Sequence, residues 1–190
     1  MKIFKHLYYK FFCNKIIKYH IDYKRDKCDD RNILESVIFP FILAEFDPQS
    51  ILDIGREGYQ EFYNDFFTGR DLWTLDYEPK HEEFGSPDKH IVDSVVNLSK
   101  HFKKNQFDFI LMNGVFGWGL NDEKDIQKTF NDIFEILKPG GIFVLGYNDD
   151  IVPLEKITGL KKLRAYKFKP LKTNEYVCSN GNHTYNFYIK

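Results

Sequence analysis

Three acidic residues stand where short apolar segments end, and their spacing is the first sign of a binding site. Asp53 and Gly55 close the first such segment, Asp76 closes the second, and Asp93 closes the third. In an open α/β sheet, ligands bind beyond the carboxyl ends of the strands. Asp76 suits a bidentate grip on ribose hydroxyls, and Asp93 suits a hydrogen bond from an adenine amino group. The three carboxylates therefore predict one nucleoside-sized site.

Glycines and rings follow the fourth apolar segment, in the run 113–121. The glycines and the two aromatic residues of this run would form a shaped wall of the same site. Trp118 would stack on a substrate or shield a cationic centre. The alternative is that Phe116 and Trp118 only fill the core.

Polar residues follow the fifth apolar segment, at positions 147–150. Tyr147 and Asp149 are candidates to orient or deprotonate an acceptor molecule, and Asn148 is a candidate to contact it. An ordinary polar loop is the alternative. The six histidines show no metal-ligand spacing, so we predict no metal site and expect solvated or capping roles for them.

Short apolar strands alternate with helices along most of the chain, which favours a parallel sheet with helices on both faces. The predicted strands span residues 50–55, 71–76, 90–93, 107–113 and 142–147. The predicted helices between them span residues 59–67 and 122–137. Residues 163–171 and 176–189 predict two further strands, which we place as a hairpin at one edge. The predicted fold class is α/β, a Rossmann-like, doubly wound, mostly parallel sheet with a C-terminal antiparallel hairpin.

The first 45 residues precede this alternation and predict a helical segment of their own. Residues 2–21 carry rings at helical spacing among lysines, which is a basic amphipathic pattern. Residues 33–46 are strongly apolar, and Pro40 would kink that helix or begin a new turn. We expect residues 1–45 to serve as a lid or interface segment of the α/β domain at 46–190, within a single domain overall. Peripheral contact of residues 2–21 with an anionic membrane is the alternative.

The formal net charge of −1 hides an uneven distribution. Residues 1–31 and 160–190 are basic, whereas residues 32–159 are acidic. The basic ends either pack beside the acidic middle or form a rim that attracts an anionic substrate or membrane surface. The chain has no run of about 18 apolar residues, the length that a spanning helix needs. Its three cysteines are too few and too scattered for a disulfide framework, so we expect a reduced, cytoplasmic compartment.

The order and spacing of these segments resemble the class I S-adenosylmethionine-dependent methyltransferases over roughly residues 48–190. The matching runs are Ile51-Leu52-Asp53-Ile54-Gly55 for the cofactor loop, Leu75-Asp76 for the ribose-binding acid, Val92-Asp93-Ser94 with Asn97-Leu98 for the adenine-binding segment, Phe107-Asp108-Phe109-Ile110 for the fourth strand, and Leu137-Lys138-Pro139-Gly140-Gly141 for the turn before the fifth strand. The final hairpin resembles the antiparallel edge strands of the family.

The resemblance implies an enzyme that transfers a methyl group from S-adenosylmethionine to a small-molecule or sugar-like acceptor. The implied cofactor-binding residues are Asp53, Gly55, Arg56, Gly58, Asp76, Tyr77, Asp93, Ser94 and Asn113. Of these, Asn113 would face the methionine amino group. Tyr147 and Asp149 stay the candidate catalytic residues, and Trp118 and Asn148 the candidate substrate-binding residues. Because little chain remains for a recognition domain, nucleic acid is not the expected acceptor, and the oligomeric state stays open.

The cofactor loop departs from the family pattern, which runs acid-x-Gly-x-Gly-x-Gly. Here Glu57 and Tyr59 occupy the second and third glycine positions, with Gly58 between them. Either the loop is rearranged and still holds the cofactor through Gly55 and Gly58, or Glu57 and Tyr59 crowd the site. The second case would make the chain a non-catalytic binding module or partner subunit. A nicotinamide dehydrogenase, the other α/β alternative, needs a Gly-x-Gly-x-x-Gly run that the chain lacks.

Overall fold

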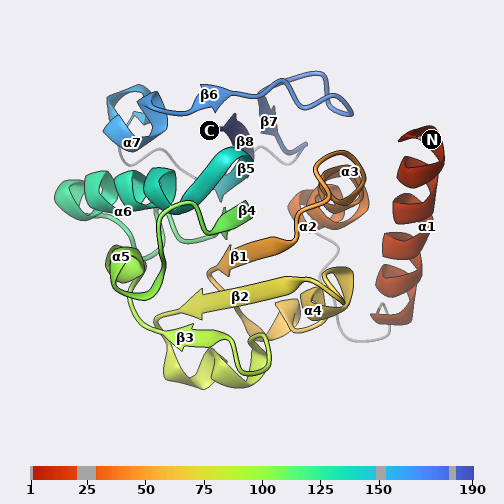
Figure 1. Cartoon of the computed structure of the whole chain (residues 1–190), viewed down its shortest axis with the longest axis horizontal. Helices are drawn as coiled ribbons and strands as arrows, with labels where there is room; N and C mark the ends of the chain where they lie inside the picture. The colour runs from red at the N-terminus through yellow and green to blue at the C-terminus, as the bar shows by residue number, and fades with distance from the viewer. Residues whose placement is uncertain (1, 21–28, 149–152, 180–182) are drawn as a thin grey trace.

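Five strands form the parallel part of the sheet, in the order β3-β2-β1-β4-β5 (Figure 1). The computed structural model describes residues 2–20, 29–148, 153–179 and 183–190. The strands are β1 (Ser50–Ile54), β2 (Asp71–Asp76), β3 (His90–Val92), β4 (Phe107–Asn113) and β5 (Leu137–Tyr147). Strands β1 and β4 are neighbours at the centre, where the strand order reverses. This is the switch point at which open α/β sheets bind ligands.

Three short strands complete the sheet in an antiparallel sense, which confirms the predicted fold class. Strand β8 (Thr184–Ile189) pairs with β5, and both β6 (Arg164–Ala165) and β7 (Glu175–Val177) pair with β8. The predicted strand over 163–171 is wrong beyond β6. Pro170 has no N–H to donate to a ladder, and the Phe168 N–H instead bonds the Thr173 carbonyl at 2.7 Å across a turn.

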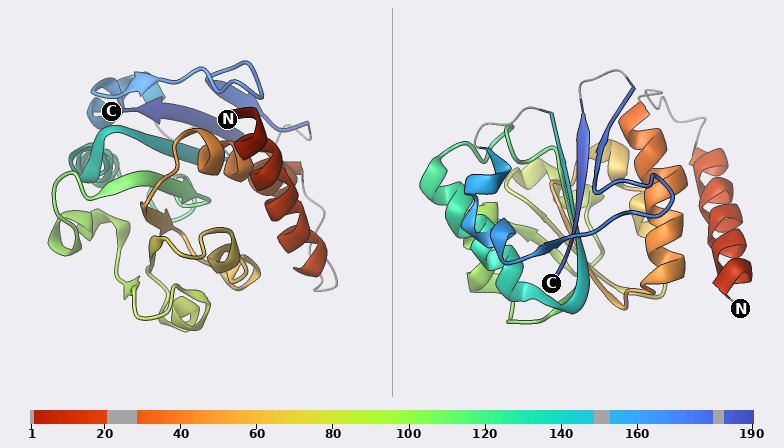
Figure 2. Two further views of the ribbon diagram at one scale, coloured as in Figure 1. Left: turned by 45° about the vertical axis from the view of Figure 1, so that its right-hand side comes forward. Right: turned by 90° about the horizontal axis from the view of Figure 1, so that it is seen from above.

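Helices cover both faces of the sheet (Figure 2). One face carries α1 (Lys2–His20), α2 (Asp29–Ile33), the π-helical turn η1 (Leu34–Ile38), α3 (Phe39–Glu45) and α4 (Tyr63–Phe66). The other carries α5 (Leu98–His101), α6 (Glu123–Ile136) and α7 (Thr158–Lys161). Short 3-10 turns occupy η2 (Gly58–Gln60), η3 (Pro79–Phe84), η4 (Val95–Asn97) and η5 (Leu154–Lys156). Pro40 is the second residue of α3 and follows the π-helical turn η1 directly, so the helix changes its hydrogen-bond pattern where this residue has no N–H to donate.

The continuous helix predicted over 59–67 is wrong, because η2 and α4 are separate turns. Arg56 Nη1 donates to the carbonyl of Gln60. A regular helix would offer that carbonyl to the N–H of Asn64, which instead bonds Glu61 at 3.1 Å. The buried guanidinium therefore sets the local backbone.

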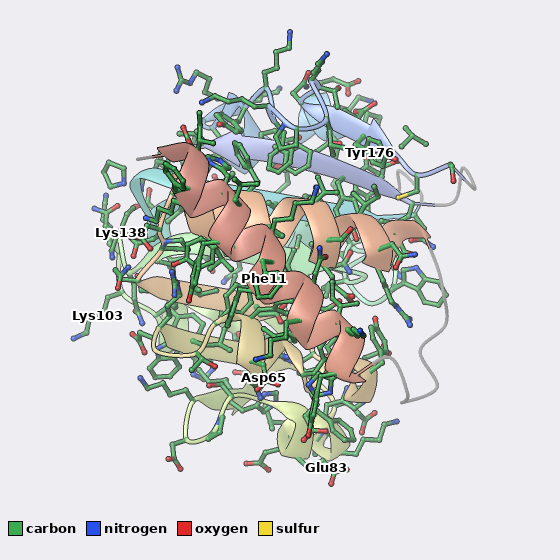
Figure 3. All side chains as sticks on the ribbon, turned by 90° about the vertical axis from the view of Figure 1, so that its right-hand side faces the viewer. Phe11, Asp65, Glu83, Lys103, Lys138 and Tyr176 are labelled. Carbon is green, nitrogen blue, oxygen red and sulfur yellow. The ribbon has the colours of Figure 1, made fainter. Side chains whose placement is uncertain are left out.

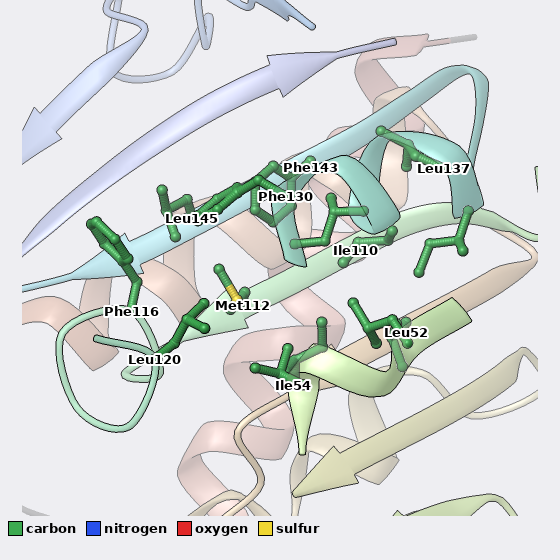
Figure 4. Close-up of a cluster of buried hydrophobic side chains, with 14 of the residues drawn as sticks. Leu52, Ile54, Ile110, Met112, Phe116, Leu120, Phe130, Leu137, Phe143 and Leu145 are labelled. Atoms are coloured by element: carbon green, nitrogen blue, oxygen red, sulfur yellow. The ribbon is translucent and has the colours of Figure 1, made fainter. Parts of the chain in front are cut away.

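The core has two halves, because successive side chains of a strand point to opposite faces. On β4, Ile110 and Met112 pack toward α6, where Phe130 and neighbouring leucines surround them (Figure 4). Phe109 and Leu111 point the other way and pack in the cluster beneath α1 and α3. All four of these β4 side chains are fully buried. Such a strand anchors its carboxyl end rigidly, and the site is built there.

Helix α1 packs against α3 through its inner face. Polar contacts hold it there: Lys5 to Asp47 at 2.9 Å, and His20 to Asp65 at 2.9 Å. The outer face, by contrast, is apolar and exposed over its first three turns, which end at Phe11 near the middle of the helix (Figure 3). Its members are Ile3, Phe4, Leu7, Tyr8 and Phe11, which are 60–78% exposed. No helix in the described part of the chain is both long and apolar enough to cross a membrane.

Candidate functional site

A cavity of about 580 Å³ opens beyond the carboxyl ends of β1, β2 and β4. Its volume lies in the usual range of small-molecule sites, roughly 300–1,000 Å³. The predicted site residues that line it are Gly55, Asp76, Tyr77, Ser94, Asn113, Trp118 and Asn148. Those that lie outside its lining are Asp53, Arg56, Gly58, Asp93 and Tyr147. Asp149 lies outside the described residues.

Gly55 is the point at which the chain leaves β1 and turns beneath the cavity. Its φ is +91°, a conformation that side-chain-bearing residues rarely adopt. A Cβ at this position would lie 2.6 Å from Val115 Cγ2 and 2.9 Å from the Asn113 carbonyl oxygen. Glycine is therefore required here for two reasons, and it leaves the backbone open to a ligand.

Asp53 and Arg56 form an ion pair behind the loop rather than in the cavity. Arg56 Nη2 lies 3.1 Å from Asp53 Oδ2, and both side chains are fully buried. Burial raises the pKa of Asp53, and the guanidinium opposes this rise. Arg56 also donates to the Gln60 carbonyl and, at 3.4 Å, to Asn64 Oδ1. The pair thus ties β1 to the turns that follow it and supports the cavity floor.

Glu57 and Tyr59, which replace family glycines, both line the cavity. The Arg31 guanidinium lies 3.6 Å from the centroid of the Tyr59 ring, so α2 holds this ring at the cavity edge. The Glu57 N–H donates to Gln60 Oε1 at 2.6 Å, which orders the start of η2. The loop is therefore rearranged around η2, and a ligand-sized cavity persists beside both side chains.

Asp76 lies at the end of β2, directly on the cavity wall. Its Oδ1 accepts a hydrogen bond from the Glu78 N–H at 2.9 Å and lies 3.0 Å from His81 Nδ1. The side chain is 6% exposed, and His81 lines the cavity beside it. These contacts hold the carboxylate in one orientation. A carboxylate that accepts hydrogen bonds from two neighbouring hydroxyls must be oriented in this way.

Asp93 at the end of β3 turns toward its own segment. Its Oδ1 accepts from the Ser94 N–H at 2.7 Å and from Asn97 Nδ2 at 2.8 Å, and its Oδ2 lies 2.7 Å from His101 Nε2. Bonds from His101 first, and from Asn97 next, lower the pKa of Asp93 to about 2. Both oxygens are thus engaged within the protein, and the neighbouring Ser94 is the residue that reaches the cavity.

Asn113 ends β4 and presents a buried acceptor to the cavity. The side chain is 8% exposed, and its Oδ1 finds no hydrogen-bond partner among the described residues. A buried acceptor without a partner costs about 1–3 kcal/mol, so such an atom is a sign of a ligand. Gly114 follows with a φ of +69° and turns the chain away from the sheet.

The two rings of the loop after β4 have different surroundings. Phe116 is fully buried and meets Phe130 edge-on, with ring centroids 5.7 Å apart. Trp118 is 69% exposed and lines the cavity at its edge. The sequence alternative that both rings fill the core is therefore wrong for Trp118. Tyr147 is 5% exposed and packs against Phe116 rather than lining the cavity.

Residues from outside the predicted set complete the wall. Asp30 and Arg31 of α2 and His183 before β8 line the cavity, although no pattern in the sequence predicts them as site residues. His183 Nδ1 lies 2.7 Å from Asn148 Oδ1, and the side chain is only 6% exposed, so the expected solvated or capping role is wrong for it. The antiparallel register that pairs Tyr147 with Thr184 brings these residues together. The antiparallel hairpin predicted from the sequence was the one signal that could have placed His183 near Asn148.

In the described part of the N-terminal segment, α2 reaches the cavity and α1 does not. Within the described part of residues 1–45, only Asp30 and Arg31 line the cavity, and α1 lies on the far side of α3 (Figure 2). The ring stripe expected to be covered on α1 faces outward instead. The inner face carries a second apolar set, so the helix is apolar on two sides.

Comparison with known proteins agrees with this architecture. A family model described as a methyltransferase domain matches residues 52–145. No curated protein sequence matches the chain. Among solved structures, the N-methyltransferase NodS from Bradyrhizobium japonicum has a TM-score of 0.66 at 15% identity, covering 87% of this chain and 98% of that one. A second NodS structure, in complex with S-adenosyl-L-homocysteine, has a TM-score of 0.56 at 14% identity, covering 94% of this chain and 98% of that one.

A third similar structure has a different source. It is a SAM-dependent methyltransferase from Archaeoglobus fulgidus, with a TM-score of 0.61 at 10% identity, and the match covers 92% of this chain and 99% of that one. At such identities the structures share the fold with this chain. The residues of the cavity must therefore be interpreted from their own geometry.

Proposed function

Because the chain belongs to the class I S-adenosylmethionine-dependent methyltransferases, we propose that it methylates a small-molecule or sugar-like acceptor in the cavity described above. The observation that carries this proposal is the cavity wall itself, where the oriented carboxylate of Asp76 and the unpartnered Oδ1 of Asn113 face one ligand-sized space. When bound, S-adenosylmethionine supplies a methyl group that its positively charged sulfur has already activated.

The residues present fit this cofactor. Asp76 would accept hydrogen bonds from the two ribose hydroxyls. Asn113 Oδ1 would accept one from the methionine amino group, which gives the buried oxygen its missing partner. Gly55 leaves its backbone open to the ligand, and Tyr77 and Ser94 line the wall beside Asp76. Asp53, Arg56, Gly58 and Asp93 then act by supporting the backbone behind the cofactor.

Trp118 and Asn148 would contact the acceptor, since both line the cavity and neither belongs to the residues expected to hold the cofactor. A ring at the edge can stack on a sugar or other flat group and exclude water from the reacting centre. The protein's main contribution would be to hold donor and acceptor in line. The limited volume favours a small acceptor over a polymer. The few scattered cysteines support a reduced, cytoplasmic compartment.

The second candidate function is a non-catalytic binding module. The side chains of Glu57 and Tyr59 on the wall favour it, because family members carry glycine at both positions. Under this alternative Glu57 would exclude the cofactor, and Glu57→Gly would restore its binding. Under the leading proposal the same change alters affinity little.

Calorimetric titration of S-adenosylmethionine and S-adenosylhomocysteine tests the proposal. We expect micromolar binding of both, weakened at least tenfold by Asp76→Ala, since a hydrogen bond to a charged group contributes about 1.5–3 kcal/mol. Asp88→Asn is the control, because Asp88 does not line the cavity and asparagine tolerates the positive φ of 61° at this position. A folded protein that binds neither compound at millimolar concentration, with Glu57→Gly restoring binding, would establish the binding module instead.

The outer face of α1 would be a peripheral contact with an anionic membrane surface. Its exposed apolar patch is accompanied by Lys10, Lys15 and Lys18, which are also exposed. Rings and aliphatic chains beside lysines match a surface of anionic lipid headgroups over acyl chains. A helix that is apolar on two sides normally has both of them covered. A second copy of the chain is the competing occupant of this face.

A further inference from the structure

His183 and Asn148 form a hydrogen-bonded pair in the cavity wall. His183 Nδ1 lies 2.7 Å from Asn148 Oδ1, and both residues line the cavity. With the Asn148 amide oriented so that its oxygen faces the ring, Nδ1 carries the proton and donates it, because an amide oxygen only accepts hydrogen bonds. Nε2 of the neutral ring is then the bare acceptor nitrogen.

The bare nitrogen has no hydrogen-bond partner in the part of the chain that the structure describes. Nε2 of His183 is buried and makes no hydrogen bond to any described residue. The side chain as a whole is 6% exposed. Buried polar atoms are nearly always satisfied, so an orphaned acceptor in a cavity wall is expected to meet a donor on a ligand.

The same nitrogen lies beside Asn113, at the predicted position of the methionine group. A Cβ built on Gly146 would come within 2.1 Å of Asn113 Oδ1 and within 2.9 Å of His183 Nε2. One methyl-sized group would thus touch both orphaned acceptors, so the two atoms are near neighbours. Glycine at 146 keeps that approach open. The neighbourhood of Nε2 is therefore the part of the cavity next to the expected methyl donor.

Burial keeps this ring neutral. It lowers the pKa of His183, and the charge of Asp30 opposes that effect. The titratable groups next to the ring are Asp30 from α2 and Tyr185 from β8, and the Cys178 N–H bonds the His183 carbonyl. Arg31 from α2 and Tyr59 from η2 act on the neighbouring Tyr185 and line the same cavity. A neutral imidazole at pH 7 is the form that can accept a proton.

We propose that His183 is the general base of the methyl transfer, positioned by Asn148, and that the acceptor bears a hydroxyl or protonated amine. This inference rests on the proposed function. As the acceptor heteroatom forms its bond to the methyl carbon, the carbon–sulfur bond breaks with both electrons going to sulfur. A hydroxyl gives its proton to Nε2 of His183 as the oxygen attacks. A protonated amine gives its proton to Nε2 first, because its nitrogen has no free electron pair until that proton leaves. The resulting imidazolium stays hydrogen-bonded through Nδ1 to Asn148 until the proton passes to water.

The first test concerns the ring itself and needs no acceptor. Nitrogen-15 NMR of histidine-labelled protein, with S-adenosylhomocysteine present, should show Nδ1 protonated and Nε2 bare at pH 7. The His183 titration midpoint should lie below the usual histidine value of about 6.5. Asn148→Asp places a carboxylate against Nδ1 and should raise that midpoint, whereas Asn148→Ala should not. A proton on Nε2 at pH 7 would overturn the proposal.

The second test measures turnover. S-adenosylhomocysteine formation is followed with a panel of simple alcohols, sugars and primary amines as acceptors. His183→Gln should lower kcat about 100-fold or more, the usual contribution of a general base. His20→Gln, a change on α1 away from the cavity, should leave kcat unaltered. Asn148→Asp should shift the ascending limb of the pH–rate profile to higher pH.

The two proposals fail differently. If calorimetry shows that wild-type protein does not bind the cofactor, the proposed function fails. If His183→Gln binds cofactor normally and keeps wild-type turnover and pH profile, only the role of His183 is overturned. If no compound of the panel is methylated, the NMR tautomer and midpoint decide the role of the ring.

Discussion

The guanidinium of Arg31 lies 3.6 Å from the centroid of the Tyr59 ring, and this contact joins α2 to the loop after β1 at the cavity edge. The two residues come from segments that the sequence analysis treated as separate units, a helical cover and a cofactor loop. The contact makes the edge of the cavity a shared structure. Ligand affinity should therefore respond to changes in α2, which lies outside the matched methyltransferase region.

Arg31→Ala should weaken binding of S-adenosylhomocysteine about two- to fivefold. A cation–π contact at a partly exposed site contributes about 0.5–1 kcal/mol, and its loss frees both α2 and the Tyr59 ring. Tyr59→Phe keeps the ring beneath the guanidinium and removes only the hydroxyl that bonds Arg31, so it should weaken binding less than Arg31→Ala does. Calorimetry measures both. Equal affinity of Arg31→Ala and wild-type protein would show that α2 does not order the cavity edge.

Arg56→Met should destabilise the fold by about 3–5 kcal/mol, because it leaves the buried carboxylate of Asp53 without its cation. The double variant Asp53→Asn with Arg56→Met removes both charges and should recover much of that loss. Urea unfolding followed by circular dichroism gives the free energies. A double variant as unstable as the single one would show that Arg56 acts through packing, not through charge.

Asp93 should make the stability of the folded protein depend on pH in the acidic range. Its pKa is lowered from 3.8 to about 2 in the folded protein, so its bonds to His101, Asn97 and Ser94 stabilise the fold fully above pH 3.8. That contribution is lost as the pH falls from 3.8 to about 2. The urea midpoint of wild-type protein should therefore fall across this window more than that of Asp93→Asn. Parallel curves for the two proteins would contradict the assignment.

The outer face of α1 should bind vesicles that contain phosphatidylglycerol and not vesicles of phosphatidylcholine alone. Phe4→Ser with Phe11→Ser should reduce sedimentation with the anionic vesicles at least tenfold, because both rings are more than 70% exposed and lose their insertion into the acyl region. The control is Asn14→Ser, a polar change on the same exposed face.

Light scattering distinguishes membrane contact of the outer face of α1 from the alternative that a second copy of the chain covers it. If wild-type protein is a dimer and the Phe4→Ser, Phe11→Ser variant is a monomer, with no vesicle binding by either, then a second copy covers α1. A monomeric wild-type protein that sediments with anionic vesicles supports the membrane contact.

The parallel part of the sheet was predictable because its signals are local. Each of its strands is a short apolar run closed by turn residues, and α6 carries a clear helical period behind an Asp122 cap. Gly55 and Asp76 belong to the site for the same reason, since a residue that ends a parallel strand faces the ligand edge whatever surrounds it. Where a local signal met a competing contact, the prediction failed. The buried Arg56 divided the helix expected over 59–67, and Pro170 interrupted the strand expected over 163–171.

By itself, the sequence determined the order of strands and helices, the fold class and the strand-end residues of the site. Only the tertiary structure decided which other residues join them. His183 meets Asn148 across 35 residues of chain because β8 pairs with β5 in one register, and Arg31 meets Tyr59 because α2 packs over the loop after β1. A one-residue slip of β8 would turn its side chains to the opposite face. Such pairings depend on long-range packing free energy, which no local run of residues encodes.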